Sequence, residues 1–222
     1  MITRSSPIGI VDSGVGGLSI LPELRQKLPN ENLLYLGDNA RFPYGNKSKS
    51  TLIKYGVELA QFLIDKEVKA IILACGTLSS NCAQAIAKEF RLPVFGIIEP
   101  SYRAWNKHKG KTVAVWATPA TIDSGTYQRI FRGQPNIKYQ ACPTLASRVE
   151  LDVQQVQLEE KAEVIVLGCT HYSWLDLKDK KAIKINGYYE LVQEVKASLW
   201  DSGLLNKGLP GKCAFYFTGD IT

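Results

Sequence analysis

The chain has no long apolar run. Although 45% of its 222 residues are hydrophobic, its longest apolar segments, such as 70–74 and 164–167, fall far short of the roughly 20 residues that a membrane-spanning helix needs. The amino terminus passes from Arg4 through two serines and Pro7 directly into a strand-like segment. It therefore has no apolar signal region with a small-residue cleavage site. We expect no membrane partner and a cytoplasmic location.

Residues that typically hold metals are also scarce. There are two histidines, His108 and His171, which lie far apart in the sequence. The five cysteines are Cys75, Cys82, Cys142, Cys169 and Cys213, an odd number that includes no CxxC pair. In a chain without a signal peptide, free thiols are expected. The sequence therefore predicts no metal site.

Charge is not concentrated in one tract. The formal net charge is +6, but the lysines are spread along the chain and indicate an ordinary solvated surface. Nucleic acid is therefore not an expected partner. A basic surface could still help to attract a dianionic substrate.

What the sequence does contain is an alternation of short Ile, Val and Leu-rich runs with amphipathic stretches, which predicts an α/β fold with parallel-rich sheets. Strands are expected at 8–11, 33–36, 71–74, 94–98, 113–116, 137–139 and 164–167. Helices are expected around 18–24, 52–64, 83–87, through Tyr127, and at 145–158. The residue before a proline disfavours helix, so a boundary is expected at Glu99-Pro100.

Two distant segments resemble each other. Residues 72–77 (ILACGT) and 166–171 (VLGCTH) each form an apolar strand that delivers a cysteine at its carboxyl end. In α/β sheets, ligands bind in the crevice beyond the carboxyl ends of the strands. Two similar α/β halves facing each other would therefore place Cys75 and Cys169 on either side of a cleft.

Two opposed thiols fit one chemistry well. Inverting an amino-acid α-carbon without a cofactor requires one group to remove a proton from one face and a second group to supply a proton from the other. The unperturbed pKa of cysteine, about 8.5, is close enough to neutrality for one thiol to be ionised while the other stays protonated. Asp12 is a candidate helper near Cys75, and His171 near Cys169.

Small polar residues also gather at or just after the expected strand ends, where they could hold an α-amino and a carboxylate group: Ser13, Tyr44, Gly45, Thr77, Thr118, Thr121 and Thr170. The glycine-rich segment 12–17 (DSGVGG) could pass for a phosphate-binding turn. However, it lacks the Lys-Ser/Thr of a P-loop and the spacing of GxGxxG. Nothing around Cys82, Cys142 or Cys213 suggests chemistry, so these cysteines are expected to be structural.

The motifs taken together resemble glutamate racemase of the aspartate/glutamate racemase family. They occur in the family's order at 12–18 (DSGVGGL), 36–38 (LGD), 43–45 (PYG), 98–100 (IEP), 117–121 (ATPAT) and 168–172 (GCTHY). The resemblance implies cofactor-independent interconversion of L- and D-glutamate, which supplies D-glutamate for peptidoglycan. It also implies two similar α/β domains with the active site in the cleft between them, expected at 1–98 plus 187–222 and at 99–186, often in a homodimer.

By the same resemblance, Cys75 and Cys169 are the proton donor and acceptor pair. Asp12 and His171 are their helpers, and Glu150 is a second carboxylate near Cys169. Substrate binding falls to Ser13, Tyr44, Gly45, Gly76, Thr77, Thr118, Thr121 and Thr170. The chain departs from the family pattern at Gly76, where an asparagine is usual, in a shorter stretch between Glu150 and Cys169, and after Tyr172.

Two other functions remain open at this point. The two-cysteine mechanism acts at Cα and does not by itself select for the length of the substrate side chain. A racemase of aspartate or another acidic amino acid is therefore one alternative. The other is a catalytically weakened relative that acts as a binding or regulatory protein, for which DNA gyrase is a conceivable partner. Retention of both cysteines argues against the second alternative.

Overall fold

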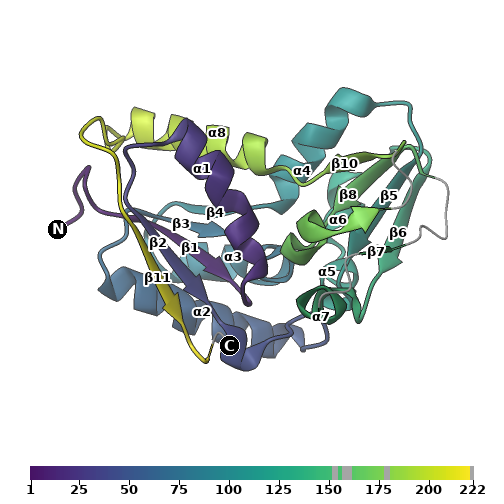
Figure 1. The fold of residues 1–222 in the computed structure, drawn as a ribbon, viewed down its shortest axis with the longest axis horizontal. Coiled ribbons are helices and arrows are strands. Elements are labelled where there is room, and N and C mark those ends of the chain that lie inside the picture. The colour runs from purple at the N-terminus through teal and green to yellow at the C-terminus, as the bar shows by residue number, and fades with distance from the viewer. Residues whose placement is uncertain (152–154, 157–161, 178–180, 221–222) are drawn as a thin grey trace.

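The computed structural model describes residues 1–151, 155–156, 162–177 and 181–220, and it has two parallel sheets (Figure 1). The first has the order β11-β2-β1-β3-β4, with β1 (Ile8–Asp12), β2 (Leu33–Gly37), β3 (Ala70–Leu73), β4 (Val94–Gly96) and β11 (Cys213–Phe217). The second has the order β10-β8-β5-β6, with β5 (Val113–Ala117), β6 (Ile137–Ala141), β8 (Val164–Leu167) and β10 (Ile183–Ile185). A short pair, β7 (Gln155–Val156) and β9 (Asp176–Leu177), lies apart from both. The predicted fold class is confirmed.

Helices separate the strands along the chain. The α-helices are α1 (Leu21–Lys27), α2 (Lys49–Asp65), α3 (Gly76–Glu89), α4 (Ile98–Trp105), α5 (Pro119–Asp123), α6 (Thr126–Ile130), α7 (Leu145–Glu150) and α8 (Tyr188–Asp201). Single 3-10 turns are η1 (Gly16–Ile20), η2 (Asn39–Arg41), η3 (Asn106–His108) and η4 (Thr170–Trp174). Helices α1 and α8 lie on one face of the first sheet and α2 and α3 on the other (Figure 1).

The alternation of side chains along the strands explains this layering. In β1, Ile8 and Ile10 pack into the cluster that includes Leu24 of α1 and Leu191 of α8. Val11, next in the sequence, points to the opposite face and joins the cluster of α2 and α3. Because both faces of a parallel sheet are covered, its strands read as nearly continuous apolar runs. The site is thus confined to the ends of the strands.

Two expected elements are wrong. The strand predicted at 94–98 ends at Gly96, and Ile98 already begins α4, so no boundary falls at Glu99-Pro100. Pro100 is tolerated because it lies in the first helical turn, where backbone N–H groups have no partner within the helix. The helix predicted at 145–158 ends at Glu150, and 155–156 is strand β7. Residues 152–154 and 157–158 lie outside the described part.

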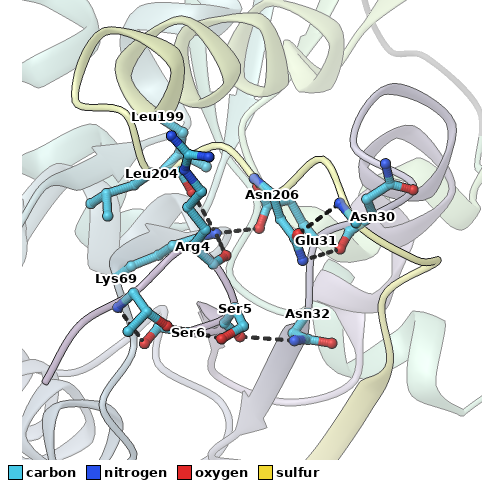
Figure 2. Close-up of polar contacts among 12 residues, drawn as sticks. Arg4, Ser5, Ser6, Asn30, Glu31, Asn32, Lys69, Leu199, Leu204 and Asn206 are labelled. Atoms are coloured by element: carbon cyan, nitrogen blue, oxygen red, sulfur yellow. Dashed lines mark hydrogen bonds and ion pairs between the residues drawn. The ribbon is translucent and has the colours of Figure 1, made fainter.

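Figure 2 shows a buried ion pair between Lys69 and Glu31, which lie just before β3 and β2 at the amino-terminal ends of these strands. Cys75 follows the other end of β3. Lys69 and Glu31 are 0% and 1% exposed, and the ammonium lies 2.5 Å from Glu31 Oε2. Lys69 also donates to the carbonyls of Arg4 (2.6 Å) and Leu204 (2.9 Å), while Glu31 accepts from the backbone N–H of Asn206 (2.8 Å). The pair therefore anchors Arg4 and the segment 204–206 to the amino-terminal ends of β2 and β3.

Among the described residues, no helix is long and apolar enough to cross a membrane, and no group of three His, Cys, Asp or Glu side chains is arranged to hold a metal ion. The five cysteines are free thiols. The domain boundaries at 98/99 and 186/187 stay a prediction.

Candidate active site

Cys75 lies directly after β3 and forms the N-cap of α3. Its side chain is buried, and its sulfur lies 3.6 Å from the Ser13 hydroxyl oxygen as a hydrogen-bond donor. Burial, followed by the charges of Asp12 and Cys169, raises the pKa of Cys75 to about 12, against the opposing contacts with the Leu78 backbone and Ser13. Cys75 is therefore a protonated thiol at neutral pH, and Cys169 lies near enough to contribute to the rise.

Cys169 occupies the matching place in the second sheet, after β8 and before η4. Its buried sulfur lies 3.7 Å from Nδ1 of His171, whose Nε2 lies 2.8 Å from Oε1 of Glu150. Burial alone lowers the pKa of His171, but the contacts with Cys169 and Glu150 outweigh it and raise that pKa to about 10. The result is a row of three side chains, Cys169, His171 and Glu150, in which a protonated imidazole lies beside the Cys169 sulfur.

Asp12 connects the two halves of the molecule through a hydrogen bond with Thr170. It is fully buried at the end of β1, where Oδ2 accepts from the Gly14 N–H (3.1 Å) and Oδ1 accepts from the Thr170 hydroxyl (3.2 Å). Burial raises its pKa to about 6, although His171 and the hydrogen bonds oppose the rise. Asp12 is thus a carboxylate that titrates near neutrality, next to the segment that carries Cys169.

Three threonines form a second set of contacts between the two halves of the molecule. Thr77 of α3 lies 2.9 Å from Thr118 and 3.3 Å from Thr121, measured between hydroxyl oxygens, and Thr118 lies 2.9 Å from Thr121. Thr118 caps α5 by accepting from the backbone N–H of Thr121. All three are buried, so three hydroxyls from both halves converge on one place.

The glycine-rich segment allows these halves to approach closely. A Cβ atom at Gly16 would lie 2.6 Å from both His171 Nδ1 and the Thr170 hydroxyl oxygen. A Cβ at Gly14 would lie 3.3 Å from Glu150 Oε1. The glycines therefore have a steric explanation that needs no phosphate: they bring the end of β1 against the Cys169 segment.

Gly76 has an even stricter requirement. A Cβ atom built there would lie 2.0 Å from the backbone oxygen of Gly168, a distance that no side chain tolerates. Glycine after Cys75 is thus required by the direct contact between the start of α3 and the end of β8. The departure from the family's asparagine has a steric reason in this chain.

The segment 38–45 touches both halves of the site, and sequence reasoning identified only part of it. The buried Tyr44 lies close enough to Cys75 for that sulfur to contribute to raising the pKa of Tyr44, after burial and Asp38. A Cβ at Gly45 would lie 2.8 Å from Thr118 Cβ. The ring centroid of Phe42, which was not predicted, lies 5.1 Å from that of His171. Asp38, which the sequence marks only as part of the LGD motif, is fully buried and accepts a hydrogen bond from Tyr44.

The structure thus places the expected site residues at or near the carboxyl ends of the strands in four hydrogen-bonded groups: Cys75 with Ser13, Cys169 with His171 and Glu150, Asp12 with Thr170, and the three threonines. Two buried thiols with different polar neighbours, Ser13 beside Cys75 and His171 beside Cys169, are suited to proton exchange with a substrate atom placed between them. The fold and this site together define an α/β isomerase.

A family model for the Asp/Glu/Hydantoin racemases matches residues 8–197, and the chain belongs to that family. The family resemblance expected from the motifs is therefore confirmed. Glutamate racemase from Aquifex pyrophilus is 40% identical over 204 residues, covering 86% of this chain and 79% of that protein. A glutamate racemase from Thermus thermophilus is 38% identical over 234 residues, covering 97% and 88%.

Solved structures agree. Glutamate racemase from Francisella tularensis in complex with D-glutamate superposes with a TM-score of 0.86 at 32% identity, covering 98% of this chain and 89% of that one. An aspartate racemase from Picrophilus torridus shares the fold, with a TM-score of 0.60 at 16% identity.

Proposed function

We propose that this enzyme interconverts L- and D-glutamate without a cofactor, using Cys75 and Cys169 as its two acid/base groups, and supplies D-glutamate for peptidoglycan. One observation carries the proposal. Two buried thiols each directly follow a strand of one of the two parallel sheets, and they have different partners, Ser13 for Cys75 and His171 for Cys169. Relatives at 38–40% identity that bear the name glutamate racemase support the choice of substrate.

The surroundings suggest a starting state. Cys75 is protonated because its pKa is raised to about 12, whereas protonated His171 favours the thiolate of Cys169. The Cys169 thiolate removes the α-proton from one face and becomes a thiol, and the electron pair left on Cα is delocalised into the substrate carboxylate. The Cys75 thiol then donates its proton to the opposite face and becomes the thiolate. The other enantiomer reacts by the reverse sequence.

The remaining groups would hold the substrate. The hydroxyls of Thr77, Thr118, Thr121 and Thr170, together with Ser13, offer donors and acceptors for an α-carboxylate and an ammonium group. Tyr44 and Gly45 flank them. Asp12, with a pKa near 6, would be ionised at neutral pH and would favour the ammonium group.

The experiment that tests this function follows the decay of circular dichroism with L-glutamate and L-aspartate in parallel. We expect decay to zero ellipticity with glutamate and little with aspartate. A preference for aspartate would establish the aspartate racemase alternative instead. If no deuterium from D₂O enters Cα of either amino acid, the chain is a binding or regulatory relative.

Glu150→Gln is expected to shift the pH dependence of kcat/KM. Glu150 helps to keep His171 protonated, so its loss lowers the pKa of His171 from about 10. The imidazolium that supports the Cys169 thiolate is then lost at a lower pH, and the alkaline limb of the profile moves towards neutrality. Rates measured from pH 6 to 10 in both proteins test this, and an unmoved alkaline limb would remove Glu150 from the mechanism.

Three expectations drawn from the sequence stay predictions: the homodimer, the weaker possibility of binding to DNA gyrase, and the cytoplasmic location. Light scattering at several protein concentrations would test the first of them.

A further inference from the structure

The carboxyl-terminal strand reaches the active-site segment 38–45. Beyond β11, the Thr218 hydroxyl donates to Asp38 Oδ1 at 2.6 Å and accepts from the backbone N–H of Ala40 at 3.2 Å. The Thr218 N–H also donates to the Gly37 carbonyl at 3.1 Å. One threonine therefore fixes the point where segment 38–45 leaves β2.

The contact continues past Thr218. Asn39 donates from Nδ2 to the Asp220 carbonyl at 2.5 Å, and its Oδ1 accepts from the Gly219 N–H at 3.3 Å. These residues are about 180 positions apart in the sequence. The end of the described chain thus lies against the start of segment 38–45 through both side-chain and backbone groups.

Asp38 carries this support towards the site. It is fully buried, and its Oδ2 accepts from the Tyr44 hydroxyl and pairs with Arg41 Nε at 2.5 Å, while Oδ1 receives Thr218. Because the single hydroxyl proton of Tyr44 is committed to Asp38, that oxygen can only accept from anything else. The Tyr44 hydroxyl oxygen, acting only as an acceptor, would suit the ammonium group of an amino-acid substrate. It has no proton to donate to a substrate carboxylate.

We propose that Thr218 and Asp38 are positioning residues that hold segment 38–45, and with it the orientation of Tyr44, against both halves of the active site. This rests on the proposed function for its kinetic consequence. The carboxyl-terminal strand would then support substrate binding and not only the edge of the first sheet. Neither residue needs to touch the substrate, because each acts through Tyr44 and the backbone of the segment.

Thr218→Val removes the hydroxyl while keeping the shape of the side chain, and Thr218→Ser keeps the hydroxyl. We expect the valine variant to lose roughly 10–100-fold in kcat/KM for glutamate, since misplacement by about 1 Å can cost that much. The loss should fall mainly on KM, with the pH profile unchanged, because Cys169, His171 and Glu150 keep their contacts. The serine variant should restore most of the loss.

Thr112→Val is a matched control. The Thr112 hydroxyl likewise donates to a carboxylate, Glu163 Oε2 (3.2 Å), and accepts a backbone N–H, that of Glu163 (3.2 Å). It precedes β5, at the strand end away from the site, so its loss should leave kcat and KM unchanged. Equal effects of Thr112→Val and Thr218→Val, or a serine variant as impaired as the valine variant, would overturn the proposal.

Hydrogen exchange separates this inference from the proposed function. Peptides covering 38–45 should exchange their amide hydrogens faster in Thr218→Val than in the wild type and Thr112→Val, whether or not glutamate is turned over. Unchanged exchange there would refute the positioning role. If segment 38–45 exchanges faster in Thr218→Val but the wild type does not racemise glutamate, the positioning role stands. Only the proposed function is then refuted.

Discussion

Replacing either Cys75 or Cys169 by serine is expected to lower kcat for glutamate racemisation by roughly 10²–10⁴-fold, the usual contribution of a positioned acid or base. A serine hydroxyl fits in the space of the thiol but ionises far less readily, so it cannot serve as the base in one direction. Because each enantiomer needs both groups, each single variant should be impaired in both directions. Circular dichroism started from L- and from D-glutamate measures this.

Cys82→Ser is the matched control for these variants. Cys82 is also a buried thiol, on α3, and donates to the Leu52 carbonyl at 3.1 Å. A serine hydroxyl can keep that hydrogen bond, so the rate should stay close to that of the wild type.

In D₂O, the wild type should place deuterium at Cα of the product enantiomer before it appears in the unreacted substrate. Full activity in Cys75→Ser or Cys169→Ser would rule out the two-base scheme.

Lys69→Met is expected to lower the free energy of unfolding by about 3–5 kcal/mol, because it leaves the Glu31 carboxylate buried without its partner. The two carbonyls that Lys69 now satisfies, of Arg4 and Leu204, also lose a donor. Urea denaturation followed by far-ultraviolet circular dichroism measures the change. Since the pair lies at the strand ends away from the cysteines, the folded fraction should keep its catalytic constants.

The double variant Lys69→Met/Glu31→Leu distinguishes an unpaired charge from lost packing. Removing both charges should recover a large part of the stability, because an apolar pair replaces a buried ion pair at little cost. Arg103→Ala breaks the exposed pair with Glu194, in which each side chain is 44% exposed, and should cost less than about 1 kcal/mol. A Lys69→Met loss as small as that of Arg103→Ala would contradict the expectation.

The fold class and the place of the cysteines could be predicted from the sequence because both depend on local patterns. An apolar run of four or five residues followed by a small or polar residue marks a buried strand and its carboxyl end. Cys75 and Cys169 could therefore be assigned to strand ends. The error at Pro100 was local too, since a proline is excluded from helix interiors but not from the first turn.

Contacts between distant segments could not be predicted in this way. Asp12 was expected to act near Cys75, and its charge contributes to raising the pKa of Cys75. Its hydrogen bond to Thr170 on the other half had no signal in the sequence. The bond between Asp38 and Thr218 joins residues 180 positions apart, and β11 carried no signal that tied it to the site. No periodicity encodes such pairs, because they depend on how the two sheets and the last strand meet in space.

The contact of Gly76 with the Gly168 oxygen has a consequence for how this chain can change over time. Gly168 is itself constrained, since a Cβ there would lie 2.8 Å from that of Ala117. The two positions are limited by different neighbours: Gly76 by the Gly168 carbonyl, and Gly168 by Ala117 and the Trp116 carbonyl. A side chain at Gly76 therefore requires the backbone at Gly168 to move, and that backbone is itself packed against β5. A descendant that acquired asparagine at 76 would have to move the whole end of β8, and the sulfur that follows it, farther from Cys75.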